Sequence, residues 1–228
     1  EEKIKKFMSY KIKTFSYPSI PSKEIIQGKK SEILNANRKN KLVFISSFKM
    51  AISKHGSYKF RYKLVKDLLR YKDFFNLYGY GWDRVPLPFD VLGIAFIIRV
   101  KFLKELIRLL MKISYKPLGK FPIAKSKEKT LENYDFTLAI EPTISKFNSI
   151  CEKIFDPMIS GSIPVYYGQD ISKTIPNNTY LKINKHTTAK ELLLKLEKIS
   201  ESKKSEYRKN IYNFLNSKNA DKYRYRTY

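Results

Sequence analysis

The chain has 228 residues, of which 43% are hydrophobic and 14% aromatic, a composition that is long and apolar enough for a globular core and excludes a disordered chain. Its 46 Lys and Arg against 21 Asp and Glu give a net charge of +25, which favours an anionic partner such as a nucleic acid, an acidic membrane surface or a phosphorylated ligand. One cysteine and two isolated histidines, His55 and His186, exclude an internal disulfide and a Cys-rich or His-rich metal site.

Part of the basicity has an alternative explanation, because Lys, Asn, Ile, Tyr and Phe are all encoded by A+T-rich codons. Residues 1–40 are polar and rich in lysine, and Pro18 and Pro21 rule out a continuous helix there. We expect a linker, or the remnant of an upstream domain. The charged start has no apolar segment of a signal peptide and begins at Glu1, so we expect a cytoplasmic protein and a fragment of a longer chain.

The first regular pattern covers residues 41–81. KLVFISS is a short apolar, β-branched run typical of a buried strand, and FFNLYGYG is a second short strand that ends in glycines. Between them, Tyr58, Tyr62, Val65 and Leu69 recur at helical spacing over residues 57–71. The pattern predicts a strand, a helix and a parallel strand.

Residues 85–116 form an insert of apolar runs interrupted by cations, too charged to span a bilayer. From Val91 to Ile113 the sequence predicts a helix with one apolar stripe, made of Phe96, Val100, Leu103, Ile107 and Leu110. Five cations fall off that stripe: Arg99, Lys101, Lys104, Arg108 and Lys112. Such a helix can lie in an anionic membrane interface, or its stripe can pack on this domain or on an upstream one.

The α/β pattern then resumes to the end of the chain. We expect strands at DFTLAI, SIPVYYG and TYLKI, and helices near 126–133, 151–160, 188–200 and 203–217. The TTAKE sequence at the start of the third of these helices resembles a capping box. The predicted fold class is therefore α/β with a parallel sheet.

Chemistry concentrates between Tyr134 and Ile183. The strand DFTLAI ends at a carboxylate, Glu141, and the helix that begins after Cys151 carries Glu152 and Lys153 in its first turn. Ligands of open parallel sheets bind at the carboxyl ends of the strands, and helix N-termini with a nearby lysine attract phosphate. A carboxylate can accept hydrogen bonds from sugar hydroxyls, while a lysine can neutralise a diphosphate.

Three segments resemble a family motif in order and spacing: YDFTLAIEP, ICEKIFDPMISGSIPVYYG and IPNNTYLKI. They are similar to the family 10 glycosyltransferases, the α-1,3/1,4-fucosyltransferases. KFRYKLVKDL places Lys59, Arg61 and Tyr62 where that family has an R-x-R-Y element, and LGK at 118–120 matches its glycine-and-lysine element. The resemblance covers about residues 41–217 and leaves the insert at 85–116 unmatched.

The resemblance implies that residues 41–217 are the Rossmann-like, nucleotide-sugar-binding half of a GT-B architecture, with helices on both faces of the sheet, followed by a basic tail at 218–228. Such an enzyme transfers fucose, or a related sugar, from GDP-fucose or another GDP-sugar with inversion. It needs no cofactor and no metal. The acceptor would be a glycan or a lipid-linked glycan, with no nucleic acid expected, and a lipid-linked acceptor would place the enzyme at the inner membrane face.

The same resemblance assigns roles to four residues. Arg61 and Lys153 would hold the diphosphate, Glu152 would contact the ribose or the developing positive charge of the sugar, and Glu141 would orient the loop or a hydroxyl. The general base, and with it the catalytic residue, is expected in an N-terminal domain.

The sequence departs from the family pattern at four positions: Pro142 replaces Asn, Asn148 replaces Gly, Ser149 replaces Tyr and Cys151 replaces Thr. A second hypothesis is therefore a non-catalytic basic binding module, either a degenerate transferase domain or a nucleic-acid binder. A transferase domain should be stabilised by GDP, whereas a nucleic-acid binder should lose affinity steeply with salt.

Overall fold

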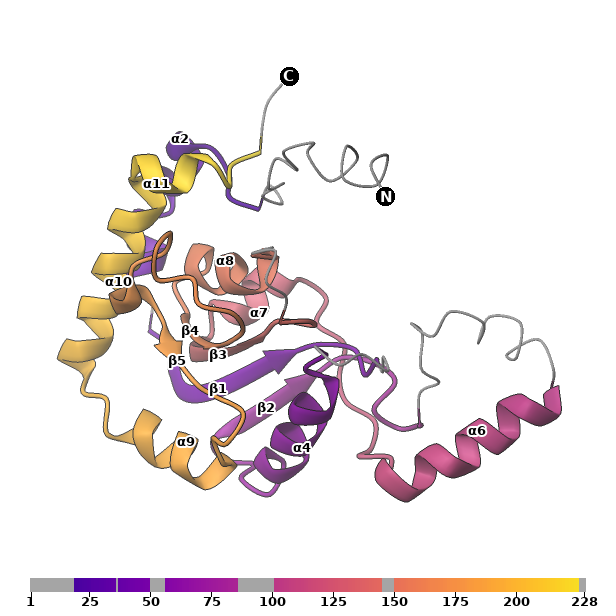
Figure 1. Ribbon diagram of the computed structural model, residues 1–228. Coiled ribbons are helices and arrows are strands. Elements are labelled where there is room, and N and C mark those ends of the chain that lie inside the picture. The colour runs from indigo at the N-terminus through magenta and orange to yellow at the C-terminus, as the bar shows by residue number, and fades with distance from the viewer. Residues whose placement is uncertain (1–18, 36, 50–55, 86–100, 145–149, 226–228) are drawn as a thin grey trace, which may run out of the picture.

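The computed structural model describes residues 19–35, 37–49, 56–85, 101–144 and 150–225. In this part of the chain, five parallel strands form one sheet in the order β2-β1-β3-β4-β5 (Figure 1). The strands are β1 (Lys39–Ile45), β2 (Phe75–Tyr78), β3 (Tyr134–Ile140), β4 (Ile163–Tyr167) and β5 (Leu181–Lys182). Every residue of β3 and β4 is buried, as expected for central strands of a parallel sheet that is covered on both faces.

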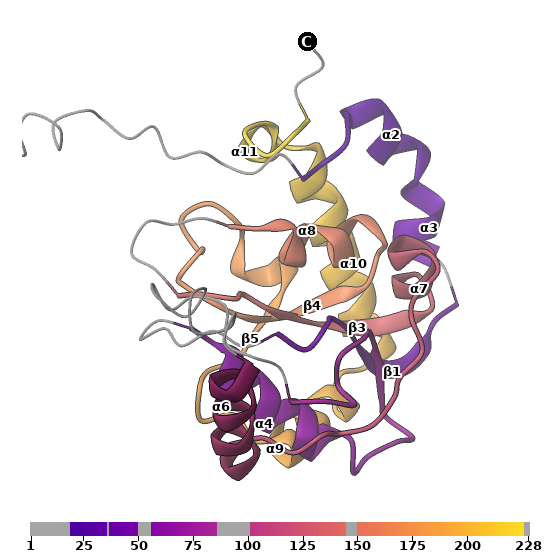
Figure 2. The same ribbon diagram turned by 90° about the vertical axis from the view of Figure 1, so that its right-hand side faces the viewer.

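Helices cover both faces of the sheet. Figures 1 and 2 show α4 (Tyr58–Leu68) and α9 (Ala189–Glu197) on one face, and α7 (Lys127–Leu131) and α8 (Glu152–Ile159) on the other. The long helix α10 (Glu201–Asn216) packs against α8 and against the 3₁₀ turn η1 (Asn177–Thr179). The predicted α/β class, with a parallel sheet and helices on both faces, is confirmed.

The individual elements follow the sequence pattern closely. The predicted unit at 41–81 is β1, α4 and β2, with Leu42 opposite Phe75 in a parallel register. The capping box is present: the Thr188 hydroxyl accepts from the backbone N–H of Glu191, whose carboxylate accepts from the backbone N–H of Thr188. The main difference is at TYLKI, where only Leu181 and Lys182 pair as a strand.

The expectation for residues 1–40 needs a correction. Residues 23–35 do not form a linker but two helices, α2 (Lys23–Gly28) and α3 (Lys30–Asn35), which pack against α10. This segment contacts the core through Ile20, which precedes α2, Ile26 of α2 and Ile33 of α3, each fully buried. Burial of three isoleucines stabilises this arrangement by roughly 1.5–3 kcal/mol each, enough to hold a segment that is polar on average.

The expected basic tail is also partly built into the domain. Residues 218–221 form α11 (Lys218–Asp221), and Ala220 and Tyr223 are buried. The Tyr223 carbonyl accepts from the backbone N–H groups of Ser19 and Ile20, at 2.8 and 2.9 Å. The two ends of the described chain are thus hydrogen-bonded to each other.

The insert contains the predicted helix, α6 (Lys101–Ser114). Phe96 and Val100 of the predicted stripe lie outside the described residues. Leu110 is exposed and Ile107 half-buried, whereas Met111 packs against the core, so the stripe does not face the body as one unit. Within the described residues, no helix combines the length and the apolar character needed to cross a membrane.

Candidate functional site

The strand order contains a switch point between β1 and β3. From β1 the chain crosses to β2 on one side, and β3, β4 and β5 extend the sheet on the other side. In open α/β sheets the crevice at the carboxyl ends of the two strands flanking this point is the usual place for a ligand. Ser46 directly follows β1 and Glu141 directly follows β3, so both lie at this edge.

The Glu141 side chain is buried and joins β3 to the start of α8. Its backbone N–H continues the strand ladder by donating to the Tyr167 carbonyl at 2.9 Å. Its carboxylate accepts from the backbone N–H of Cys151 at 3.3 Å and from the Cys151 thiol at 2.7 Å. Burial raises the pKa of Glu141 above its ordinary value, although the bonds from Cys151 oppose this shift.

Cys151 is the N-cap residue of α8. Burial, with the neighbouring Glu141 carboxylate, raises the pKa of its thiol far above the ordinary value, so the thiol stays protonated at neutral pH and donates to Glu141. Cys151, which stands where the family motif has Thr, thus keeps a side-chain hydrogen-bond donor at the helix N-terminus.

Glu152 and Lys153 open α8, and both reach solvent, with 41% and 27% of their side chains exposed. Lys153 Nζ lies 3.0 Å from Glu152 Oε1. Partial burial acts to raise the pKa of Glu152, but the hydrogen bond and charge of Lys153 lower it overall. Burial likewise acts to lower the pKa of Lys153, and Cys151 with the two carboxylates raises it overall. The two side chains are therefore charged at neutral pH, at a helix N-terminus that itself favours anions.

Arg61 is the most unusual residue at this edge. It lies in the first turns of α4 with 4% of its surface exposed, and burial lowers its pKa to about 10, so it stays protonated at neutral pH. Its guanidinium donates to Ser46 Oγ at 3.3 Å and to the Lys49 carbonyl at 3.1 Å, and stacks over the Tyr58 ring. In the described part of the chain no carboxylate pairs with it. A buried cation with only neutral partners has the desolvation cost of burial without a counter-charge, so the site favours an anion.

The structure brings the four predicted residues to one edge of the sheet but in two groups. Glu141, Glu152 and Lys153 are joined through Cys151, whereas Arg61 bonds to the loop after β1. The groups are linked by Ser57, the N-cap of α4, because its backbone N–H donates to the Pro142 carbonyl at 3.0 Å and its hydroxyl donates to the Glu141 carbonyl. The start of α4 and the end of β3 are therefore adjacent.

Two residues besides the four predicted ones shape the floor of this edge. Tyr166, in β4, is fully buried, and its hydroxyl has no hydrogen-bond partner in the structure. A Cβ atom at Gly168 would lie 2.3 Å from that hydroxyl and 2.8 Å from Glu141 Cγ. Only glycine leaves room at this position, a signal already present in the sequence as the glycine that ends SIPVYYG.

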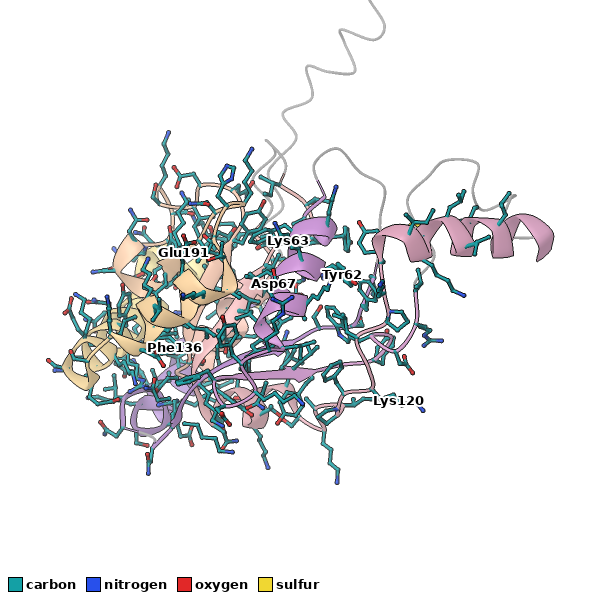
Figure 3. The ribbon with its side chains drawn as sticks, turned by 90° about the horizontal axis from the view of Figure 1, so that it is seen from below. Tyr62, Lys63, Asp67, Lys120, Phe136 and Glu191 are labelled. Carbon is teal, nitrogen blue, oxygen red and sulfur yellow. The ribbon has the colours of Figure 1, made fainter. Side chains whose placement is uncertain are left out.

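The remaining family-like residues have structural roles. The Tyr62 hydroxyl donates to the Lys116 carbonyl at 3.0 Å and accepts from the Lys116 backbone N–H at 2.8 Å, which fastens the chain after α6 to α4 (Figure 3). Tyr167 packs its ring on Phe60 of α4. Asn148 and Ser149 lie outside the described residues. Among the residues that are described, no group of three His, Cys, Asp or Glu side chains is placed to hold a metal ion.

Comparisons with known proteins agree with the motif. Residues 97–223, which are 127 of the 228, match the family model described as glycosyltransferase family 10 (fucosyltransferase), C-terminal part. The match begins inside the segment that the motif comparison left unmatched. No curated protein matches the chain.

Solved structures give weaker similarities. A crystal structure of an α1,3-fucosyltransferase with GDP-fucose is 17% identical and has a TM-score of 0.42, with 84% of this chain and 41% of that chain covered. The structure of an α1,3-fucosyltransferase with GDP is also 17% identical, with a TM-score of 0.42 and coverages of 80% and 39%. The C-terminal domain of a group 1 family glycosyl transferase from Francisella tularensis is 12% identical, with a TM-score of 0.39 and coverages of 90% and 95%. The chain thus spans about two fifths of the length of these fucosyltransferases.

Proposed function

This chain belongs to glycosyltransferase family 10, and from this premise we propose that it is the donor-binding domain of a fucosyltransferase-like enzyme. The donor substrate is GDP-fucose or another GDP-sugar. The enzyme transfers the sugar with inversion to a glycan or a lipid-linked glycan, without a metal or a cofactor. The two domains of the whole enzyme form a GT-B architecture.

One observation carries the proposal: a buried arginine, with no carboxylate partner among the described residues, lies beside the switch point of the sheet, at the same edge as a helix N-terminus that presents a lysine. Arg61 donates to Ser46, which follows β1, and Lys153 lies in the first turn of α8, the helix after β3. β1 and β3 are neighbours in the sheet. A diphosphate between them would supply the negative charge that Arg61 lacks and would meet the N-terminus of α8.

The roles of the residues follow from the reaction. The acceptor hydroxyl attacks the anomeric carbon of the sugar, the bond from that carbon to the diphosphate oxygen breaks, and GDP leaves with two negative charges on its terminal phosphate. In this metal-free scheme Arg61 and Lys153 stabilise that charge electrostatically. Glu152 faces the ribose or the positive charge that develops on the sugar ring, and Glu141 holds the start of α8 through Cys151. A general base in the N-terminal domain accepts the hydroxyl proton.

The first test of the donor is ligand-induced stabilisation. A nucleotide that binds only the folded protein raises its melting temperature, so GDP should raise it more than UDP at equal concentration. Equal shifts, or none with either nucleotide, would contradict the donor assignment. Binding to an oligonucleotide that weakens steeply with salt, without any shift by GDP, would instead support the nucleic-acid-binding alternative.

The second test separates the diphosphate from the nucleoside. Lys153→Ala should weaken GDP binding by roughly 10- to 150-fold, the loss of one charge-assisted hydrogen bond of about 1.5–3 kcal/mol, and leave guanosine binding nearly unchanged. Lys203→Ala is the matched control, because Lys203 lies exposed on α10, where it pairs with Glu206 and lies over the Tyr207 ring. Isothermal titration with both ligands decides the matter, and an equal loss for guanosine would show that Lys153 does not act on the phosphates.

A further inference from the structure

Helix α6 presents an apolar face to solvent. Four large apolar side chains are exposed along it: Leu106 at 42%, Leu109 at 61%, Leu110 at 57% and Ile113 at 80%. Each of the other helices and strands that the structure describes exposes at most one large apolar side chain. At 3.6 residues per turn these four positions fall within an arc of about 100°, so they form one continuous stripe.

The helix is held to the domain at one end. Met111 packs against the core and Tyr115 is buried, where its ring meets that of Tyr62 at a centroid distance of 4.9 Å. Beyond this attachment α6 stands out from the body of the domain (Figures 1 and 3). The exposed stripe therefore belongs to a helix whose inner edge is already anchored, and the described part of the domain does not cover it.

Positive charge lies along another arc of the same helix. Positions 101, 104, 108 and 112 are all Lys or Arg, and at 3.6 residues per turn they fall within about 80°, centred about 150° from the centre of the apolar stripe. Lys112 is exposed. The helix thus has an exposed apolar face and a basic one, on a chain with a net charge of +25.

We propose that α6 lies in the surface of an anionic membrane, with Leu106, Leu109, Leu110 and Ile113 among the acyl chains and its cations at the level of the headgroups. Interfacial helices with this division of charged and apolar faces bind by burial of the apolar face and by attraction to acidic lipids. The domain is then a peripheral membrane protein attached through α6.

Charge decides between a lipid surface and a second copy of the chain. Two α6 helices paired through their stripes would bring together two basic helices and two bodies of charge +25, which repel each other. An anionic bilayer offers the same apolar environment with charge of the opposite sign. A lipid surface therefore buries the apolar face and attracts the basic face of the helix, whereas self-association only buries the apolar face.

Cosedimentation with vesicles tests the proposal. The wild-type chain should bind phosphatidylglycerol vesicles at least tenfold more tightly than phosphatidylcholine vesicles. Its affinity for phosphatidylglycerol vesicles should fall as the salt concentration is raised from roughly 50 to 500 mM, because salt screens the surface charges. The combined variant Leu106→Gln, Leu109→Gln and Ile113→Gln should lose at least tenfold in affinity, because it removes three of the four side chains of the apolar stripe and keeps every cation. Glutamine is chosen because its helix propensity is close to that of leucine.

A matched variant controls for apolar surface in general. Ile25→Gln, Ile123→Gln and Leu194→Gln replace three exposed apolar side chains outside α6, and this variant should bind vesicles like the wild type. Circular dichroism and melting temperature verify that both variants are folded. Wild-type binding that is absent or equal for the two lipids, unchanged binding by the α6 variant, or a solution dimer that this variant converts to a monomer would overturn the proposal.

Discussion

The two ends of strand β3 each have a buried carboxylate, but only the one at the start of the strand is paired with cations, whereas the other accepts from neutral donors. Asp135, near the start of the strand, is 4% exposed at its side chain and lies between two cations of α10. Lys204 Nζ is 2.7 Å from Asp135 Oδ2, and the Arg208 guanidinium donates to Asp135 Oδ1. Glu141, after the end of the strand, accepts its hydrogen bonds from the thiol and N–H of Cys151 instead.

The difference separates two edges of the sheet: the Asp135 edge, called the matched edge below, and the Glu141 edge, which carries the proposed donor site and is called the open edge. At the Asp135 edge, the buried charges of both signs are matched within the chain, and the Lys204 ammonium also reaches Asn40 and Glu201. At the Glu141 edge, Arg61 is charged and buried with neutral partners. An edge with matched charges stabilises the chain, whereas an edge with an unmatched cation is prepared for an anion from outside.

The largest effect is expected at the matched edge. Asp135→Asn removes the buried counter-charge that Lys204 and Arg208 share and leaves Lys204 only its exposed partner Glu201. Removal of one partner of a buried ion pair costs about 3–5 kcal/mol. Urea denaturation should show this loss in the free energy of unfolding. Asp221→Asn, which removes an exposed partner of Lys23 and Arg224, should change that free energy little. Equal effects of the two substitutions would mean that the buried cluster does not stabilise the fold.

The open edge should respond in ligand binding more than in stability. Arg61→Met removes a cation that has no carboxylate partner in the described part of the chain, so the free energy of unfolding should change by no more than about 1 kcal/mol. GDP binding should weaken roughly 10- to 150-fold, the equivalent of about 1.5–3 kcal/mol. Arg208→Met should instead cause a large loss in the free energy of unfolding and little change in GDP binding. Calorimetric titration and denaturation of both variants test the contrast, which fails if Arg61→Met destabilises the chain as much as Arg208→Met does.

A third prediction concerns the space beside Glu141. Gly168→Ala places a Cβ atom against the Tyr166 hydroxyl and Glu141 Cγ, and overpacking of this kind costs about 1–3 kcal/mol. Gly28→Ala is the control, because a Cβ atom there meets nothing within 4 Å and alanine suits the helix better than glycine. In thermal unfolding, Gly168→Ala should have a lower melting temperature than the wild type, and Gly28→Ala should not. A Gly168→Ala protein as stable as the wild type would show that Tyr166 and Glu141 move apart freely.

The smallest effect is a dependence on pH. The pKa of Glu141 is raised in the folded state above its ordinary value of 4.5, so the stability that this carboxyl contributes is present below that value and is lost as the pH rises through the folded-state pKa. Glu141→Gln has no such titration. The variant should therefore gain stability relative to the wild type as the pH is raised from about 4.5 towards neutrality. Denaturation at a series of pH values measures this difference, and a constant or opposite trend would contradict it.

The sequence predicts the strands, the helices on both faces and the identity of the charged residues at the open edge. These depend on short-range patterns: apolar runs such as YDFTLAI, helical spacing in α4, and a long motif around Lys153. Contacts between distant segments leave no such pattern. The hydrogen bond between Glu141 and Cys151 joins residues ten positions apart. The burial of Arg61 depends on the side chains from other segments that pack around it.

Two other differences have specific physical causes. In α2 and α3, the buried residues are one isoleucine each, Ile26 and Ile33, within a polar, lysine-rich stretch, so average composition indicates a linker. In α6, apolar positions cover a much wider arc than one stripe, and the sequence does not determine which part of that arc faces the domain. The structure places Met111 inward and Leu109 and Ile113 outward.

The cluster at the start of β3 also sets the order in which the chain can fold. Asp135 is separated from Lys204 by 69 residues and from Arg208 by 73, so a nascent chain that has reached only β5 holds the central strand with its carboxylate uncompensated. The hydrogen bonds of Ser19 and Ile20 to Tyr223 extend over nearly the whole described chain. A fold whose contacts join such distant segments is complete only once residues 204–223 are available, and it forms slowly because the distant segments must meet before these contacts can form. Ribosome-bound chains from which only residues before 204 have emerged should accordingly remain sensitive to protease, and those from which Tyr223 has emerged should resist it.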